Sequence, residues 1–434
     1  MRNRGMLVAV AVAVLVVLAS ACTATVRVSV GANGQSNGSS FLPAVDGSGR
    51  FVAFQSSATN LAAGDTNGHD DVFVRDTRNN VTSLVSRATN GTLGNGDSTE
   101  PEISANGQFV LFSSDASNFV AGDDNDASDV FLRDRHAHTT RLVSRATDGT
   151  VADGPSHAAA LSADGTKAVF TSFADDIVTG ASGSQVYIAD LTTGAVRRIS
   201  SPALCPYHDG YVVLQVGATG DASHVAYAAK CTAGPYDTFP IRSALVVVAR
   251  DVAARRNTVA WSFAYQSDPF EEFNINSLSF AAGGSQLAWN VDDEIGIHND
   301  VFTPYIWSPS SVQARVLDLP DEPTSVSLSP DGTRVAYTWP LPDYLSGLPH
   351  ARIKLFDIPS SNTYEVTVPI DGPAFEHPDG DSARPTFSGD GAQLVWDSNA
   401  GDLVPGDTNG ASDVFTRPIS DVTGGGGDAR RVSG

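Results

Sequence analysis

The sequence contains little positive charge. Its 434 residues include 27 lysines and arginines against 49 aspartates and glutamates, so the formal net charge is −22. A protein this acidic repels phosphate backbones and anionic lipid headgroups. The composition therefore disfavours nucleic-acid binding, and it leaves a covalently attached lipid as the expected route to a membrane.

Cysteine is also scarce, with three residues in the whole chain. Cys205 and Cys231 are 26 residues apart, and an exported protein can keep such a pair as a disulfide. We expect one bridge within a single repeat, and the alternative is a pair of buried free thiols. Two cysteines alone do not make a metal site.

The N-terminus carries an apolar run of twelve residues, Leu7–Leu18, preceded by two arginines. Twelve residues are too few to span a bilayer, and the flanks are those of a secretory signal, so residues 1–21 are interpreted as a signal peptide. Ala19–Ala21 fits ordinary signal peptidase. The same stretch followed by Cys22 resembles a bacterial lipobox, which predicts a lipid on Cys22, with residues 22–25 as the lipidated or flexible N-terminus. The alternative is a secreted protein.

Long helical periodicity is absent, and the chain instead repeats itself. Phe54, Phe112 and Phe170 are spaced 58 residues apart. The serines of the preceding loops keep the same spacing: Ser40, Ser98 and Ser156. Repeats of about 40–60 residues with several strand-like runs are typical of a β-propeller. The aromatic residue that marks the period occurs seven times: Phe54, Phe112, Phe170, Tyr227, Trp289, Tyr337 and Trp396.

Each copy contains four strand-like runs, which in the second copy are 102–104, 109–112, 129–132 and 141–144. Ala105–Gly107 joins the first two, and its Asn-Gly pair predicts a type I′ hairpin turn. Seven copies of four runs predict an all-β, seven-bladed β-propeller with four antiparallel strands per blade. It would form a single domain over residues 26–434. Six or eight blades are the alternatives.

A propeller ring must close, because an open end leaves unpaired strand edges. Val26–Val30 matches the fourth run of the other copies and is a candidate for the outer strand of the last blade. Arg431–Ser433 is a candidate for the same edge, since Gly424–Gly427 is a flexible linker. The sequence leaves both options open.

Two phrases carry a family resemblance. Leu328–Tyr337 reads Leu-Ser-Pro-Asp-Gly-Thr-Arg-Val-Ala-Tyr, and Asp71–Asp76 reads Asp-Val-Phe-Val-Arg-Asp. They resemble the WD-like, PD40-type repeat of bacterial TolB-type propellers over roughly residues 26–433. The resemblance implies a propeller outside the cytoplasm that offers its faces to protein partners. TolB itself has six blades and a separate α/β domain ahead of them, whereas this chain has seven copies and no room for that domain.

A loop shared by copies one, two and seven is the best candidate for a metal site. Acidic or amide oxygens recur at its first, third and seventh positions: Asp65, Asn67 and Asp71; Asp123, Asn125 and Asp129; Asp407, Asn409 and Asp413. Alternating oxygen ligands in a tight loop suit Ca²⁺. The alternative is an Asx turn, in which these side chains accept backbone N–H bonds. The pattern lacks the bidentate glutamate of an EF-type loop.

Catalytic patterns are weak. Gly34–Gly38 reads Gly-Gln-Ser-Asn-Gly, which fits the nucleophile-elbow string, but no strand and helix flank it as an α/β-hydrolase requires. Two acidic clusters with a histidine, Glu376–Asp381 and Asp292–Asp300, could hold a divalent cation and are otherwise solvated loops. We therefore expect no catalytic residues.

The favoured function is a non-catalytic binding scaffold, lipid-anchored at the bacterial envelope, that binds a protein or glycan through the drifted copies four to six. The alternatives are a metal-dependent carbohydrate lyase or hydrolase acting at the channel mouth, and a purely structural envelope protein. Convergence of carboxylates with histidines would favour metal chemistry: His208, His298, His350 and His377. A mouth lined by apolar and aromatic side chains alone would favour binding.

Overall fold

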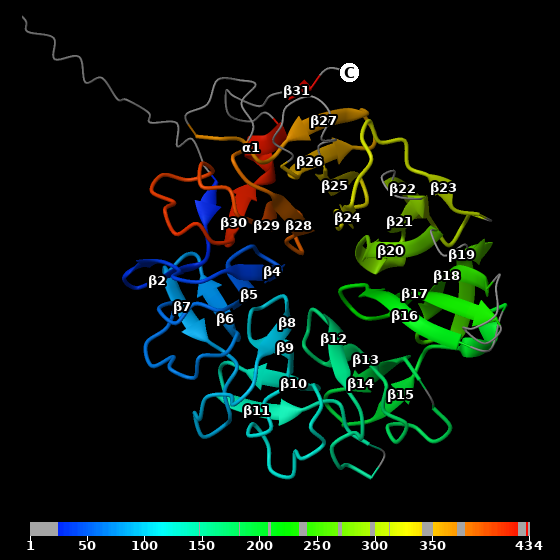
Figure 1. Ribbon diagram of the computed structural model, residues 1–434, viewed down its shortest axis with the longest axis horizontal. Coiled ribbons are helices and arrows are strands. Elements are labelled where there is room, and N and C mark those ends of the chain that lie inside the picture. Colours follow the sequence, from blue (N-terminus) through cyan, green and yellow to red (C-terminus); the bar gives the residue numbers. More distant parts are fainter. Residues whose placement is uncertain are drawn as a thin grey trace, which may run out of the picture.

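The computed structural model describes residues 25–423 and 431–432, except for 147, 182, 207–209, 234–240, 268–270, 296–299, 312, 341–349 and 371–377. Seven antiparallel sheets surround one axis (Figure 1), so the protein is a seven-bladed β-propeller. The prediction of seven blades is confirmed, and the alternatives of six and eight are excluded. The signal peptide and Cys22 lie outside the described residues.

The strands follow the chain from the axis outward within each blade. Blade one contains β4 (Ser40–Val45), β5 (Phe51–Ser56), β6 (Asp71–Asp76) and β7 (Val81–Leu84). Blade two contains β8 (Ser98–Ile103), β9 (Phe109–Ser114), β10 (Asp129–Asp134) and β11 (Thr139–Leu142). Blade three contains β12 (Ser156–Leu161), β13 (Lys167–Ser172), β14 (Gln185–Asp190) and β15 (Val196–Arg198). Blade four contains β16 (Gly210–Ala218), β17 (His224–Ala233), β18 (Ile241–Asp251) and β19 (Arg256–Ser267). Blade five contains β20 (Glu271–Phe280), β21 (Leu287–Ile295), β22 (Asp300–Trp307) and β23 (Arg315–Val316).

The last two blades recruit strands from the two ends of the chain. Blade six contains β24 (Ser325–Leu328), β25 (Arg334–Trp339), β26 (Arg352–Asp357), β27 (Asn362–Glu365) and β31 (Arg431–Val432). Blade seven contains β28 (Ser382–Phe387), β29 (Gln393–Ser398), β30 (Asp413–Pro418) and β1 (Val26–Arg27). The remaining elements are short: β2 (Val30–Gly31), β3 (Gly34–Gln35), η1 (Pro202–Leu204), η2 (Ala282–Gly284) and α1 (Ile419–Thr423). None of the helices among the described residues has the length and apolarity to cross a membrane.

The repeated aromatic residue is a core position. Phe54 is fully buried and stacks on Phe73 of the neighbouring strand, with ring centroids 6.0 Å apart. Phe112 stacks on Phe131 in the same way at 5.9 Å. Each such side chain contributes about 1.5–3 kcal/mol through burial. Since the core clusters join side chains of adjacent blades, no blade buries its apolar surface alone.

The repeated serine joins three strands. In blade two, the Ser98 hydroxyl lies 2.9 Å from that of Ser114, which also donates to the Asp97 carbonyl. The Ser98 backbone N–H donates to the Asp70 carbonyl at the end of the preceding loop of blade one. The hydroxyl of this serine thus joins the first two strands of its own blade, which explains why serine keeps the period, while its backbone N–H holds the start of the innermost strand to the blade before it.

The turn between the first two strands of blade two is not of type I′. A type I′ turn requires positive φ at both central residues, whereas Gly107 has φ +69° and Asn106 does not have positive φ. The Gly107 N–H donates to the Ser104 carbonyl, as in a type I turn followed by a glycine bulge. A Cβ on Gly107 would lie 2.2 Å from the Phe51 ring of blade one, so close packing between blades also requires glycine here.

The ring closes through the N-terminal strand. β1 pairs antiparallel with β30, and Val28 N–H donates to the Val414 carbonyl. β31 pairs instead with β27 as a fifth strand of blade six. The two candidate closing strands thus occupy different blades, and Figure 1 shows the blue β1 ribbon beside β30.

Asp413 secures this closure. It accepts hydrogen bonds from Ser29 and Ser36 at 2.5 and 2.8 Å, and Asn409 donates to its second oxygen at 3.0 Å. Arg27 lies 3.7 Å from the same carboxylate. Ser36 is the serine of the Gly34–Gly38 string, so its hydroxyl serves this structural bond.

Cys205 and Cys231 form a disulfide in blade four, with Cα atoms 5.8 Å apart. The bridge ties the segment after η1 to β17 and sits within a buried apolar cluster. Closing a loop of 26 residues contributes roughly 3 kcal/mol through the entropy of the unfolded chain.

We expect Asp413→Ala to lower the free energy of unfolding by about 3 kcal/mol, because it leaves several buried polar groups at the closure without their partner. Urea unfolding followed by circular dichroism measures the loss. The control is Asp124→Ala, at an exposed position in the equivalent loop of blade two, which should change stability by less than about 0.5 kcal/mol. Equal losses in the two variants would contradict this role for Asp413.

Candidate functional site

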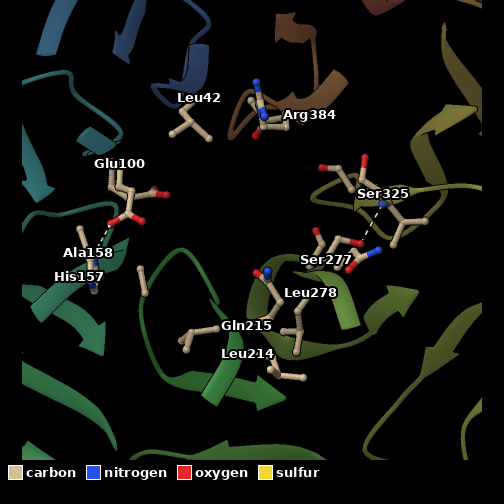
Figure 2. Close-up of a pocket in the computed structure, with 18 of the residues that line it drawn as sticks. Leu42, Glu100, His157, Ala158, Leu214, Gln215, Ser277, Leu278, Ser325 and Arg384 are labelled. Atoms are coloured by element: carbon tan, nitrogen blue, oxygen red, sulfur yellow. Dashed lines mark hydrogen bonds and ion pairs between the residues drawn. The ribbon is translucent and has the colours of Figure 1, made fainter. Parts of the chain in front are cut away.

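The central channel holds a cavity of about 530 Å³, whose wall contains residues from the innermost strand of every blade. Figure 2 shows Leu42, Glu100, His157, Gln215, Ser277, Ser325 and Arg384 around this space. Neighbouring blades are joined along the wall, where the Val326 N–H donates to Ser277 Oγ at 2.9 Å. The wall is therefore a continuous surface built from residues far apart in the sequence.

Three of the innermost strands present their channel residues on strained bulges. Leu42, Glu100 and Arg384 have φ of +51°, +53° and +54°, and each precedes a proline within a register shift. A non-glycine residue rarely adopts positive φ, and proline disfavours helical backbone at the residue before it. Such strain costs on the order of 1–3 kcal/mol per residue. The same kind of bulge thus carries an apolar side chain in blade one, an acidic side chain in blade two and a basic side chain in blade seven.

The wall at blades two and three is acidic. Glu100 accepts a 2.7 Å hydrogen bond from Ser113 and lies 3.3 Å from His157 Nδ1, and this contact raises the pKa of His157. Glu102 lines the cavity on the same strand, and its carboxyl group has no hydrogen-bond partner within the described part of the chain, although its backbone pairs with Leu111. Burial, followed by the charge of Glu100, raises the pKa of Glu102 to about 8.

The wall at blade seven is basic. Arg384 donates two hydrogen bonds of 2.8 Å to Asp397, one to each carboxylate oxygen, and its guanidinium lies 5.7 Å from the ring centroid of Phe41. Asp397 is 3% exposed, and this burial raises its pKa even though Arg384 opposes the shift. Nearly half of the Arg384 side chain remains exposed to the channel.

Blades four and five extend further than the others. After Tyr227, β17 continues to Ala233, whereas β5 ends two residues after the equivalent Phe54. The extra length adjoins the connection between second and third strands, so it lies on the face that carries the Asp–Asn loops of blades one, two and seven. Aromatic side chains pack between blades four and five. The rings of Trp261 in blade four and Tyr305 in blade five, for example, have centroids 5.4 Å apart.

The Asp–Asn loops form Asx turns. Asn125 Oδ1 accepts the N–H of Ala127 at 3.0 Å, and its amide donates to the Asp129 carboxylate at 2.9 Å. Asn409 makes the equivalent bonds to Ala411 and Asp413 in blade seven. In these two loops, the asparagine thus turns its amide, not its oxygen, toward the aspartate.

The last aspartate of each loop is part of the strand framework. In blade one, the Ser86 hydroxyl donates to Asp71 at 2.5 Å and accepts the Val72 N–H at 3.0 Å. Ser144 makes the same link to Asp129 in blade two. Burial raises the pKa of Asp71 and of Asp129 to about 6. Blade three keeps the link with Gln185 in place of the aspartate.

The predicted histidine and acidic clusters are partly outside the described residues, including His208, His298, His377 and Glu376. His350 Nδ1 lies 3.7 Å from Asp381, whose carboxylate accepts the Ala351 N–H. Among the residues that the structure describes, no group of three or more His, Cys, Asp and Glu side chains could hold a metal ion. The channel wall is mixed in character, so it meets neither of the two criteria set from the sequence.

Sequence reasoning missed the channel residues. The signal for them is a proline three residues after the repeated serine, at Pro43, Pro101 and Pro385. A proline inside a strand indicates a bulge or an edge, and an innermost strand is an edge strand, because it pairs only with the second strand of its blade. The recurrence would have located the bulges, although the chemistry of the preceding residue differs in each blade.

Comparisons with known proteins support the fold alone. No protein-family model matches the sequence, and no curated protein matches it. The β-propeller domain of the trilobed protease from Pyrococcus furiosus is similar with a TM-score of 0.52 and 11% identity, over 87% of this chain and 92% of that one. That propeller has an open velcro topology, whereas here β1 completes the last blade.

Two further structures are more distant. TolB from Acinetobacter baumannii has a TM-score of 0.35 and 15% identity, over 64% of this chain and 55% of that one. The acylaminoacyl peptidase from Pyrococcus horikoshii has a TM-score of 0.45 and 12% identity, over 70% of this chain and 43% of that one. The propeller expected from the TolB-type repeats is confirmed as a fold by the seven sheets of this structure and by its similarity to the trilobed-protease propeller.

The raised pKa of Glu102 predicts a specific pH dependence. Between about pH 4.5 and 8 the folded protein retains a proton on Glu102 that the unfolded chain has lost, so this stabilisation disappears as the pH rises through 8. Glu102→Gln keeps the side chain neutral. Its melting temperature should match that of the parent at pH 4.5 and exceed it by about 2–4 °C at pH 9. Glu322→Gln, at an exposed position, is the control, and an offset for Glu102→Gln that does not change with pH would contradict the assignment.

Proposed function

We propose that this protein is an exported propeller, anchored at the bacterial cell envelope by a lipid on Cys22, that binds a basic protein segment in its central channel without catalysing a reaction. The channel wall is the observation that carries the proposal. It brings Glu100, Glu102 and His157 to one side of a 530 Å³ cavity, and cavities of this size are typical of ligand sites.

Charge supports a basic partner. The net charge of −22 attracts cationic segments over distance. Glu100 and Glu102 lie on one strand, and the charge of Glu100 disfavours ionisation of Glu102, whose pKa is raised. A lysine or arginine side chain placed between them would relieve this repulsion and gain charge-assisted hydrogen bonds. Arg384 across the channel favours a segment that also carries an acidic or carbonyl group.

The remaining wall suits a peptide backbone. Gln215 and Ser327 line the cavity with an amide and a hydroxyl group that both donate and accept hydrogen bonds. The longer strands of blades four and five enlarge the face where a bound segment would enter. Irregular connections on a regular scaffold more often serve recognition than the scaffold itself.

Export and anchoring rest on the sequence. The apolar run Leu7–Leu18 and the lipobox-like stretch before Cys22 predict processing and lipidation, and the disulfide of Cys205 and Cys231 suits an oxidising compartment outside the cytoplasm. A glycan partner is the competing interpretation of the channel. The sequence alternatives of a metal-dependent lyase or hydrolase and of a purely structural protein gain no specific support from the described residues.

The binding proposal is tested by capture from solubilised native envelope with the immobilised protein. We expect a specific protein to be recovered with the parent and lost at least tenfold with Glu100→Gln/Glu102→Gln, because a desolvated charge contact is removed. Arg78→Ala, exposed at the outer edge of blade one, is the control and should retain capture. Equal recovery with the double variant would place the partner elsewhere, and retention of a glycan by that variant would favour the glycan interpretation.

The anchoring proposal is tested by detergent phase partitioning after expression in a bacterium that processes lipoproteins. The parent should enter the detergent phase and incorporate labelled palmitate, because the acyl chains of a lipidated Cys22 partition into micelles. Cys22→Ser should remain in the aqueous phase without label. An unlabelled, aqueous parent would instead indicate a secreted protein.

A further inference from the structure

The Asp–Asn loop of blade one differs from its copies in how its carboxylates are paired. Asp65 is 7% exposed and Asp71 is fully buried. One oxygen of each, Asp65 Oδ1 and Asp71 Oδ2, has no hydrogen-bond partner within the described part of the chain. The equivalent carboxylates of blade seven, Asp407 and Asp413, both lie within 4 Å of one guanidinium, so the loop holds its first and last aspartates near one another. Two buried anionic groups with unpaired oxygens are costly unless a cation joins them.

Blade seven shows how the same pair receives a cation. The Arg27 guanidinium lies 3.1 Å from Asp407 and 3.7 Å from Asp413, the residues equivalent to Asp65 and Asp71. The loop therefore brings its first and last aspartates within reach of one positive charge. In blade one, no arginine forms an ion pair within 4 Å with Asp65 or Asp71 among the described residues; Arg87 acts on the charge of Asp65 from further away, and its Nε is also buried without a hydrogen-bond partner.

Blade two shows the opposite case. Asp129 has a partner for each oxygen, Ser144 at 2.6 Å and Asn125 at 2.9 Å. Asp123 is only partly buried, so water can solvate its charge. This loop is satisfied by the protein itself and offers no buried oxygen for an ion.

We propose that Asp65 and Asp71 hold a calcium ion in the blade-one loop, where Arg27 supplies the positive charge in blade seven. Carboxylate oxygens are the hard ligands that Ca²⁺ requires. Asn67 is not counted among the ligands, because its Oδ1 accepts the His69 N–H at 3.3 Å and its amide donates to the Gly94 carbonyl at 3.2 Å. Water completes the coordination, and so few protein ligands suit the affinity of extracellular calcium modules, about 10⁻⁴–10⁻³ M.

The test is calcium binding by the chelator-treated full-length protein. Isothermal titration with CaCl₂ should give one site, and about 10 mM CaCl₂ should raise the melting temperature by about 2–4 °C relative to EDTA, because a ligand bound only to the folded state stabilises it. MgCl₂ at the same concentration should give a smaller shift. Zero or three sites would overturn the proposal.

Two matched variants locate the ion. Asp65→Asn should abolish both the titration heat and the melting shift, whereas Asp123→Asn, at the equivalent position of blade two, should retain both. Retention of binding by Asp65→Asn, or its loss in Asp123→Asn, would overturn the assignment to blade one. Terbium luminescence of the parent, displaced by calcium at one equivalent, gives the stoichiometry without any variant and so keeps the proposal falsifiable if Asp65→Asn does not fold.

Discussion

The fold depends on hydrogen bonds between consecutive blades. On one face, backbone N–H groups of the first turns donate to the next blade in series, from Asp390 to Gly47, Gly47 to Ala105, Ala105 to Ala163 and Ala163 to Gly220. At the other ends of the innermost strands, Ser40 and Ser98 donate to the blade before them. Since adjacent blades also share one apolar core, each sheet is stable only between its neighbours.

This constraint explains which parts of the fold could be predicted. Residues that bond or pack between blades must recur at the same place in each copy, so the period of Phe54 and Ser40 gave the number of blades and the position of their strands. Features that make no contact common to all copies are not marked by a residue that recurs in the sequence. Ring closure is an example, since β1 and β31 fit the same edge by sequence.

The channel could not be read from the sequence for the same physical reason. Its wall combines two to four residues from each of the seven innermost strands, and their side chains are free of the packing that imposes a repeat. Glu100 and Arg384 occupy equivalent bulges but share no chemistry, so no motif connects them. Only the backbone of these bulges repeats, and the proline after each residue marks it in the sequence. The proline indicates where a side chain faces the channel, but it does not indicate which side chain that is.

The Asp–Asn loops show the limit of motif reasoning most directly. Nearly the same seven residues occur in blades one, two and seven, yet their carboxylates differ in their partners. Asp65 and Asp71 each keep one unpaired oxygen, Asp129 is hydrogen-bonded through both oxygens, and an arginine lies beside both Asp407 and Asp413. Part of the difference arises outside the motif, because Arg27 comes from the N-terminal strand that closes the ring, and part within it, because Asn125 donates to the second oxygen of Asp129. The last aspartate is retained in all three because it accepts the serine hydroxyl that fixes the outer strands, as Ser86 does for Asp71. The repeat therefore preserves the hydrogen bond between the outer-strand serine and the last aspartate of the loop. The residues around each loop decide whether a cation can bind to its carboxylates.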